Sequence, residues 1–271
     1  MSRGRLVQLA LVGAAAGLFS GLFGVGGGVV IVPLLVLWLA FDERTATGTS
    51  LLAIAIVATA AVLVQLAYGN VRFWDGVMVG IPAIGGVLFG TWIQHHIPAA
   101  VVRLLFTILL VATAVLLVAG GPGTAAAAAG SGGGAGYVIA AILIGAAAGV
   151  LSGLLGVGGG ALFVPALVLV LGHAQVEAEA TSLLAIVPVS LVGAWRQKGY
   201  GNLDPQAGLV IGLSAIPFAV IGVITVNAAP TKVVEVAFAL LLLWVAWRMG
   251  RDAVRELRET RSGARGPAGS H

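Results

Sequence analysis

Hydrophobic residues recur along the chain in ten apolar segments, five in each half, with short polar turns between them. In the first half the segments span residues 6–23, 29–41, 46–68, 76–95 and 100–119. In the second half they span residues 137–155, 161–172, 178–197, 207–226 and 233–247. A helix needs about 20 apolar residues to cross a bilayer. The pattern therefore predicts an all-α polytopic membrane protein.

The two halves of the chain are copies of one another. At an offset of 132 residues, 17–37 aligns with 149–169, and 14 of these 21 positions are identical. The same offset aligns 49–54 with 181–186 without a gap. A constant register over such a length indicates duplication. It also argues against a signal peptide at the N-terminus, because that segment returns in the second half.

The repeats divide the chain into a first transmembrane repeat (1–119), a flexible Gly/Ala-rich linker (120–136), a second transmembrane repeat (137–247) and a basic tail (248–271). Of 271 residues, 59% are hydrophobic and 9% are charged, against about 25% charged in soluble domains. This composition excludes a soluble enzyme, a disordered chain and a nucleic-acid binder. Arginines in the tail, together with Arg3 and Arg5, predict that both termini are cytoplasmic and that the protein lies in the cytoplasmic membrane.

The second segment of each half is too short to cross a bilayer alone, with 13 and 12 residues, and contains Pro33 or Pro165. If it forms a hairpin with the first segment, each half crosses three times and the repeats are inverted. If the two segments form one broken crossing, each half crosses four times and the repeats are parallel. Together the two segments are too long for one straight crossing, which favours the inverted arrangement.

A glycine-rich sequence, G-V-G-G-G, breaks each half between its first two segments. Broken backbone within a bilayer is tolerated only where it lines a cavity or is buried in protein. Free N–H groups at the start of the following short helix would form an anion site without any charged side chain. The alternative is that these glycines serve tight helix packing. The substrate-binding residues predicted in these motifs are Gly24, Gly26, Gly27, Gly28, Gly156, Gly158, Gly159 and Gly160.

Polar residues inside the apolar segments are the other candidates for an anion-binding shell. They are predicted to face the protein interior and to donate hydrogen bonds to an oxyanion. Interhelical hydrogen bonding, or helix capping at the two threonines, is the competing interpretation. Asn70 and Asn202 are interpreted as turn formers. The predicted residues of this group are Ser20, Thr49, Ser50, Gln65, Ser152, Thr181, Ser182 and Gln197.

Charged residues are expected only at the ends of the apolar segments. Glu177 and Glu179 precede the third segment of the second half and are assigned to an interface, so no carboxylate proton relay is predicted. The chain has no cysteine, and its four histidines show no metal or catalytic spacing. We therefore predict no catalytic residue, no metal and no cofactor.

The duplicated motif S-G-x-x-G-V-G-G-G, with a proline five residues on and T-S-L-L-A-I downstream, resembles the sulfite exporter TauE/SafE family of membrane permeases. The resemblance covers residues 6–247. It implies transport of small sulfur-containing anions, such as sulfite and organosulfonates, usually outward across the cytoplasmic membrane. The matching positions are Ser20, Gly24 to Gly28 and Pro33, with Ser152, Gly156 to Gly160 and Pro165.

The sequence thus predicts an anion permease that works by alternating access, with one repeat bundle moving against the other around a site at the midplane. The inside-negative potential would itself drive a monoanion outward. The expected partners are a sulfur oxyanion or sulfonate substrate and the lipid bilayer, with homo-oligomerisation left open. The rival interpretations are a non-transporting membrane scaffold or assembly factor and an intramembrane enzyme, for which no catalytic dyad is visible.

Overall fold

The computed structural model describes residues 2–94, 96, 107–108, 111, 114–115 and 134–263. The first half contains α1 (Arg3–Phe23), α2 (Gly28–Leu37), α3 (Glu43–Ala67) and α4 (Phe73–Ile93). The second half contains α7 (Ala135–Leu155), α8 (Gly160–Leu169), α9 (Gln175–Gly199), α10 (Pro205–Ala228) and α11 (Thr231–Gly263). The predicted all-α class is confirmed. Most of the predicted segment 100–119, and the linker up to residue 133, lie outside the described residues.

Six described helices are long and apolar enough to cross a membrane, namely α1, α3, α4, α7, α9 and α10. They have 21 to 25 residues, and at about 1.5 Å per residue each is long enough to span a hydrocarbon core. By contrast, α2 and α8 have 10 residues each. The two segments that were too short to span are therefore half-helices, as predicted.

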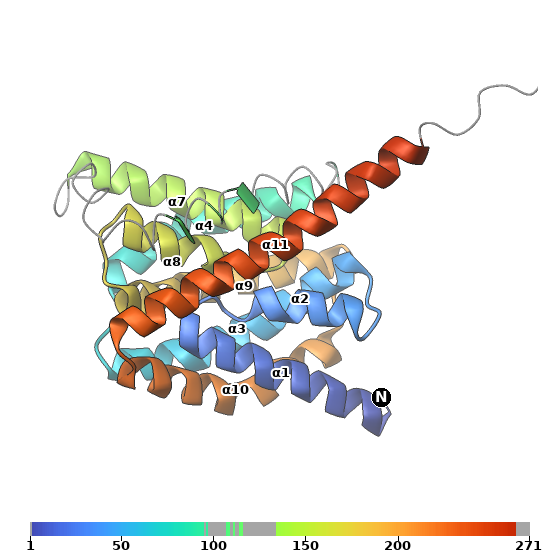
Figure 1. Cartoon of the computed structure of the whole chain (residues 1–271), viewed down its shortest axis with the longest axis horizontal. Helices are drawn as coiled ribbons and strands as arrows, with labels where there is room; N and C mark the ends of the chain where they lie inside the picture. Colours follow the sequence, from blue (N-terminus) through green and yellow to red (C-terminus); the bar gives the residue numbers. More distant parts are fainter. Residues whose placement is uncertain are drawn as a thin grey trace, which may run out of the picture.

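Each half-helix folds back beside the helix that precedes it, so that the pair forms a hairpin (Figure 1). The Arg5 guanidinium, near the start of α1, lies 5.2 Å from the centre of the Phe41 ring, just after α2. In the second half the Tyr137 hydroxyl lies 3.4 Å from His173 Nε2. These two pairs occupy equivalent positions at the 132-residue offset. The entrance and exit of each hairpin therefore lie on the same side.

The two repeats are inverted relative to each other, and hydrogen bonds between the equivalent helices α3 and α9 show this directly. The backbone N–H of Arg72, after the end of α3, donates to Thr181 Oγ1 near the start of α9 (3.0 Å). The N–H of Asp204, after the end of α9, donates to Thr49 Oγ1 near the start of α3 (3.0 Å). The two helices thus run antiparallel, and the favoured inverted arrangement is confirmed.

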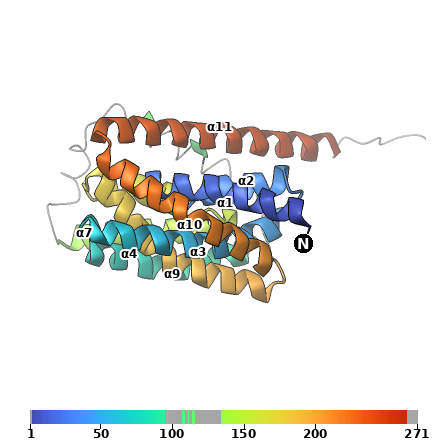
Figure 2. The ribbon, with the colours of Figure 1, turned by 90° about the horizontal axis from the view of Figure 1, so that it is seen from below.

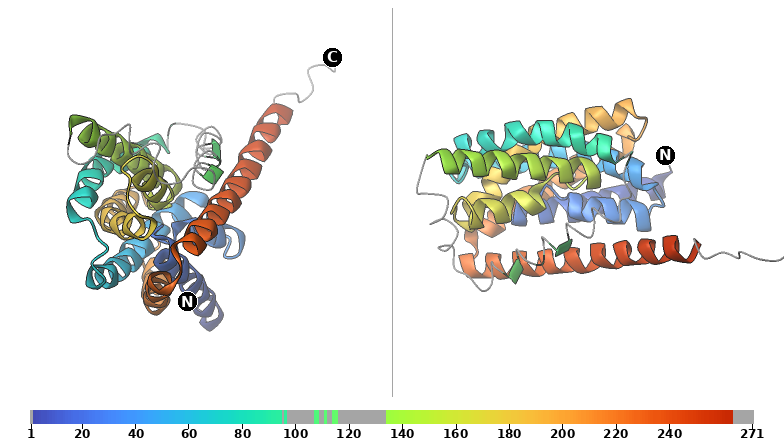
Figure 3. Two further views of the ribbon diagram at one scale, coloured as in Figure 1. Left: turned by 60° about the vertical axis from the view of Figure 1, so that its left-hand side comes forward. Right: turned by 90° about the horizontal axis from the view of Figure 1, so that it is seen from above.

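The first helix of each repeat packs against the fourth helix of the other repeat through small residues. A Cβ placed on Gly17 of α1 would overlap the Ala215 carbonyl of α10, and one on Gly149 of α7 would overlap the Ala83 carbonyl of α4. Figure 3 shows α4 and α7 side by side in its right-hand view. Small residues let membrane helices approach at backbone distance. These two exchanged contacts interlock the repeats.

The last helix, α11, lies along one face of the bundle, as Figure 2 shows. It runs without a break through residue 247, where the sequence predicts the boundary between the second repeat and the tail. On the bundle axis, Leu51 and Ile54 of α3 and Leu183 and Ile186 of α9 are fully buried. The core is therefore centred where the two glycine breaks meet.

Candidate functional site

The glycine breaks have the same backbone geometry in both repeats. In the first, α1 ends at Phe23, and Gly24 (φ 64°) caps the helix by donating its N–H to the Ser20 carbonyl (2.9 Å). Gly26 and Gly27 follow with φ of 73° and 76°. Their counterparts Gly158 and Gly159 both have φ of 80°. These are left-handed conformations that glycine adopts without steric cost, which explains the composition of the motif.

The two breaks touch each other at the centre of the protein. A Cβ on Gly28 would lie 2.7 Å from the Val157 Cα, and a Cβ on Gly160 would lie 2.5 Å from the Val25 Cα. Residues 24–28 and 156–160 are all buried. Each break therefore brings its backbone against the backbone of the other, and only glycine fits at Gly28 and Gly160.

Backbone donors at this junction are left without partners. Within the described residues, the N–H groups of Gly26, Gly27, Gly158 and Gly159 make no hydrogen bond, and the first donors after each break are Val30 and Leu162. Consecutive N–H groups in such turns form concavities that bind anions, and the start of a helix adds a positive dipole end. The predicted glycine residues thus present donors from two opposed half-helices, α2 and α8.

Two buried hydroxyl groups lie one turn before the breaks. Ser20 in α1 and Ser152 in α7 are fully buried, and their Oγ atoms have no hydrogen-bond partner among the described residues. A buried polar group without a partner is costly. These two hydroxyls are therefore available to a ligand held at the glycine breaks.

The serines of the T-S-L-L-A-I sequences brace the breaks across the repeat interface. Ser50 Oγ donates to the Gly156 carbonyl, and Ser182 Oγ donates to the Gly24 carbonyl, both at 2.6 Å. Since a hydroxyl carries one proton, neither can donate to an anion in this arrangement. Thr49 and Thr181 accept the backbone bonds that hold the loops after α9 and α3. All four are near the breaks, but they support the backbone.

The two predicted glutamines lie toward opposite ends of the bundle, and Gln197 is linked to the second break because its partner Gln94 donates to the Leu154 carbonyl (2.9 Å). Gln65 Oε1 accepts hydrogen bonds from Asn70 (2.9 Å) and Asn227 (3.1 Å). At the other end, Gln197 Nε2 donates to Gln94 Oε1 (2.6 Å). Gln94 was missed in the sequence because its counterpart at the 132-residue offset is the apolar Val226, whereas Asn227 aligns with His95 and was not singled out.

Asn70 and Asn202 do more than form turns, because their side chains belong to these glutamine networks. Asn202 Nδ2 donates to Gln197 Oε1 (3.3 Å), as Asn70 does to Gln65. The turns themselves depend on Gly69 and Gly201, which have φ of 75° and 77°. Each of the two glutamines is thus part of a network of amide side chains.

The expectation that Glu179 lies at an interface is wrong. Glu179 is in the second turn of α9, fully buried, and its backbone lies directly against Gly24. Its Oε1 accepts a hydrogen bond from Gln175 (2.9 Å), while Oε2 has no partner among the described residues. The sequence does carry a signal for this burial. Glu179 lies three and seven residues before Ser182 and Ile186, on the inward face of the helix.

Glu177, the other acidic residue assigned to that interface, belongs to a charged cluster around the loop after α8. It pairs with Arg72 (2.6 Å), and His173 lies 3.2 Å from Asp75 and 3.8 Å from Glu177. Burial lowers the pKa of His173, and the two carboxylates oppose this effect. Glu177 raises the pKa of Arg72 through the hydrogen bond between them. These charged groups therefore pair with one another at one end of the bundle.

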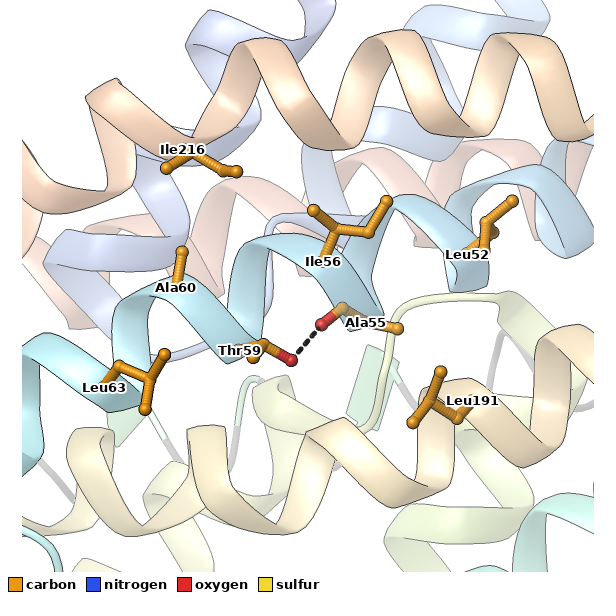
Figure 4. A pocket seen from close by; sticks show the side chains of 8 residues that line it. All are labelled: Leu52, Ala55, Ile56, Thr59, Ala60, Leu63, Leu191 and Ile216. Atoms are coloured by element: carbon orange, nitrogen blue, oxygen red, sulfur yellow. Dashed lines mark hydrogen bonds between the residues drawn. The ribbon is translucent and has the colours of Figure 1, made fainter.

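A separate groove of about 410 Å³ lies between α3, α9 and α10 (Figure 4). Its polar side chain is Thr59, whose hydroxyl donates to the Ala55 carbonyl (2.6 Å). Leu63 and Leu191 on its walls are more than half exposed, as expected for side chains that face lipid. Because the Thr59 hydroxyl proton is already donated to a carbonyl, it is not offered to an anion. The apolar walls of the groove suit acyl chains instead.

Comparison with known proteins places this architecture in a family. The family described as sulfite exporter TauE/SafE matches residues 2–117 and 141–270. A probable membrane transporter protein YdhB of Bacillus subtilis is 26% identical over 224 residues, which cover 83% of this chain and 91% of the relative. A probable membrane transporter protein of Haemophilus influenzae is 41% identical over 81 residues, 27% of this chain and only 30% of that protein. The match spans both repeats, so the chain belongs to the sulfite exporter TauE/SafE family of membrane transporters.

Proposed function

We propose that the protein is a permease for small sulfur-containing anions, such as sulfite or organosulfonates, and that the anion binds between the two glycine breaks. The observation that carries this proposal is the meeting of two opposed breaks whose N–H groups and adjacent serine hydroxyls lack partners. A tetrahedral or pyramidal oxyanion offers several acceptor oxygens to such donors. The inverted repeats would then expose the site alternately to the two sides.

The charge distribution supports a cytoplasmic location for both ends of the described chain. The start of α1, the start of α3, the end of α9 and the end of α11 lie toward the same end of the bundle (Figure 1), and these segments contain ten of the lysine and arginine residues in the described ranges: Arg3, Arg5, Arg44, Arg196, Lys198, Arg248, Arg251, Arg255, Arg258 and Arg261. Arg72 and Lys232 lie on the opposite side. By the positive-inside rule the first side is cytoplasmic in the inner membrane. Because the chain has no cysteine, Arg44→Cys and Arg72→Cys can be labelled with an impermeant thiol reagent, and only Arg72→Cys should react from outside.

The serine hydroxyls give the sharpest test of the binding site. Ser20→Ala and Ser152→Ala remove groups that have no partner in the empty protein, so neither should reduce the free energy of unfolding. Each should weaken sulfite binding about tenfold, because a hydrogen bond to a charged group contributes about 1.5 kcal/mol. Calorimetric titration of the purified protein measures this affinity. Flux into proteoliposomes measures transport.

Ser214→Ala is the matched control, since the Ser214 hydroxyl already donates to the Val210 carbonyl of its own helix (2.7 Å). Its affinity should equal that of the parent. Parent-like affinity in both Ser20→Ala and Ser152→Ala would remove the serines from the site. An anion that binds but is never transported would favour the rival function, a non-transporting scaffold.

A further inference from the structure

A buried acid beside one glycine break distinguishes the second repeat from the first. At the 132-residue offset, Glu179 is equivalent to Thr47, and the two residues occupy equivalent places: a Cβ on Gly24 would meet the backbone of Glu179, and one on Gly156 would meet that of Thr47. The Thr47 hydroxyl donates to the Glu43 carbonyl of its own helix (2.9 Å). Among the described residues, one carboxyl group therefore belongs to a residue packed against the breaks, and that residue lies at the Gly24 break.

The surroundings of Glu179 do not compensate a negative charge. Its side chain is fully buried, one oxygen accepts a single hydrogen bond from the neutral Gln175, and the other has no partner. No ion pair involves Glu179 within the described residues. An uncompensated buried carboxylate is strongly disfavoured against its protonated form. The site is therefore suited to taking up and releasing a proton.

Titratable groups at the same end of the bundle form no ion pair with Glu179 among the described residues. They come from α4, α7, α9, α11 and the intervening loops, and they are Arg72, Asp75, Tyr137, His173, Glu177 and Lys232. Arg72 pairs with Glu177, and Asp75 lies beside His173. Lys232 is exposed, at the start of α11. In α2, which follows the Gly24 break, and in α8, the sequence has no charged residue.

We propose that Glu179 is the proton-binding site that couples proton movement to anion transport, one proton with each anion. This inference rests on the proposed function of the glycine breaks. An anion at the breaks and an ionised Glu179 would place two negative charges together, so binding of one disfavours the other. Protonation of the carboxylate removes the repulsion, and the neutral acid and the anion then cross together. The proton is released with the anion when the site opens to the other side.

This stoichiometry changes the driving force expected from the sequence. One proton carried with one monoanion moves no net charge, so the membrane potential would not drive the cycle, and a pH gradient would. A gradient of one pH unit should sustain about a tenfold accumulation of the anion, since one unit is a tenfold difference in proton concentration.

The test uses proteoliposomes containing the full chain, with methanesulfonate as the probe. This sulfonate is fully ionised near neutral pH, so any proton that moves with it is carried by the protein. An inward gradient of the probe should acidify the lumen, as reported by an internal pH dye, and a clamped membrane potential should leave the initial rate unchanged. Glu179→Gln keeps the acceptor for Gln175 and mimics the protonated acid. It should exchange labelled methanesulfonate across the membrane without acidifying the lumen.

Glu177→Gln is the control, two residues away in the charged cluster, and it should behave as the parent does. Acidification that persists in Glu179→Gln, or methanesulfonate transport by the parent without acidification, would overturn the coupling while leaving the permease intact. A parent that carries neither methanesulfonate nor sulfite would instead overturn the proposed function, and the coupling with it.

A binding experiment decides the case in which Glu179→Gln does not transport at all. Calorimetric titration in two buffers of different ionisation enthalpy counts the protons taken up on binding. The parent should take up close to one proton per methanesulfonate when titrated at a pH where Glu179 is ionised, and Glu179→Gln should bind with none. Loss of binding in a folded Glu179→Gln, or unchanged proton uptake, would contradict the proposal.

Discussion

The hairpin of α1 and α2 and the hairpin of α7 and α8 share one backbone but differ in their chemistry. Both end a long helix at a left-handed glycine, both start a half-helix of 10 residues, and both are held by a serine from the opposite repeat. At the open end of the first hairpin, the Arg5 guanidinium lies over the Phe41 ring. At the mouth of the second stand Tyr137 and His173.

The comparison separates the residues that hold the fold together from the residues that we assign to the function. Because the repeats are inverted, their equivalent residues face opposite sides of the membrane. Residues that are identical in both repeats, the glycines of the breaks and the serines that brace them, build the junction. His173 and Glu179 of the second repeat, which can titrate, are replaced in the first repeat by Phe41 and Thr47. At these two positions the second repeat thus carries titratable groups that the first lacks.

The largest effect is expected at the contact between the two breaks. Gly28→Ala and Gly160→Ala each place a Cβ within 3 Å of the backbone of the other break, which cannot move without shifting a half-helix. Each should reduce the free energy of unfolding by about 3 kcal/mol, as overpacking of a rigid core does. Thermal unfolding in detergent measures the change.

Gly85→Ala in α4 is the matched control, because a Cβ there meets nothing within 4 Å. It should leave the free energy of unfolding unchanged or raise it by about 0.5 kcal/mol, since alanine favours helix over glycine. If Gly28→Ala and Gly160→Ala differed from each other by more than the error, or matched Gly85→Ala, the two breaks would not form the symmetric contact described.

An intermediate effect is expected from the bracing serines. Ser50→Ala and Ser182→Ala remove the donors to the Gly156 and Gly24 carbonyls and leave these buried oxygens without that partner. Each should cost about 1.5 kcal/mol of unfolding free energy. Thr225→Ala, at an exposed hydroxyl bonded within its own helix, should cost much less. If only one of the two substitutions reduced the free energy of unfolding, the two breaks would not be held symmetrically.

The smallest effect should come from the difference between His173 and Phe41. Burial lowers the pKa of His173 below its ordinary value of 6.5, so the folded state favours the neutral ring. The stability that this contributes is complete above pH 6.5 and is lost as the pH falls through 6.5 toward the folded-state pKa. His173→Phe, which copies the first hairpin, should lose this part of the pH dependence of the melting temperature. A parent melting profile that stays flat between pH 7 and pH 5 would contradict the assignment.

The sequence predicts the repeat, the half-helices and the glycine breaks because these depend on local pattern. The inverted arrangement also follows, since two segments totalling about 35 residues must fold back within a bilayer. The partners of the hydroxyl groups do not follow. Ser50 and Ser182 look like ligands for an anion in the sequence, yet each finds a carbonyl more than 100 residues away.

Glu179 shows the same limit from the other direction. A glutamate two residues from Glu177 and next to a polar turn is typical of an interface, and only the crossing of α9 against the Gly24 break buries it. For the serines and for Glu179 alike, the surroundings depend on contacts between the two repeats. Alignment at the 132-residue offset shows which residues of the two repeats are equivalent, but it does not show which residues of one repeat contact the other.

The central claim is that one anion binds between the two glycine breaks, and the most direct measurement is anomalous diffraction from crystals soaked with selenite. Selenite has the shape and charge of sulfite, and selenium marks its position independently of the protein density. The account predicts an anomalous peak between the two breaks, placed so that the selenite oxygens accept from the N–H groups of Gly26 and Gly158, and weakened in crystals of the Ser20→Ala, Ser152→Ala double variant. A peak in the groove of Leu63 and Leu191 or at the Arg72 cluster, with none between the breaks, would contradict it.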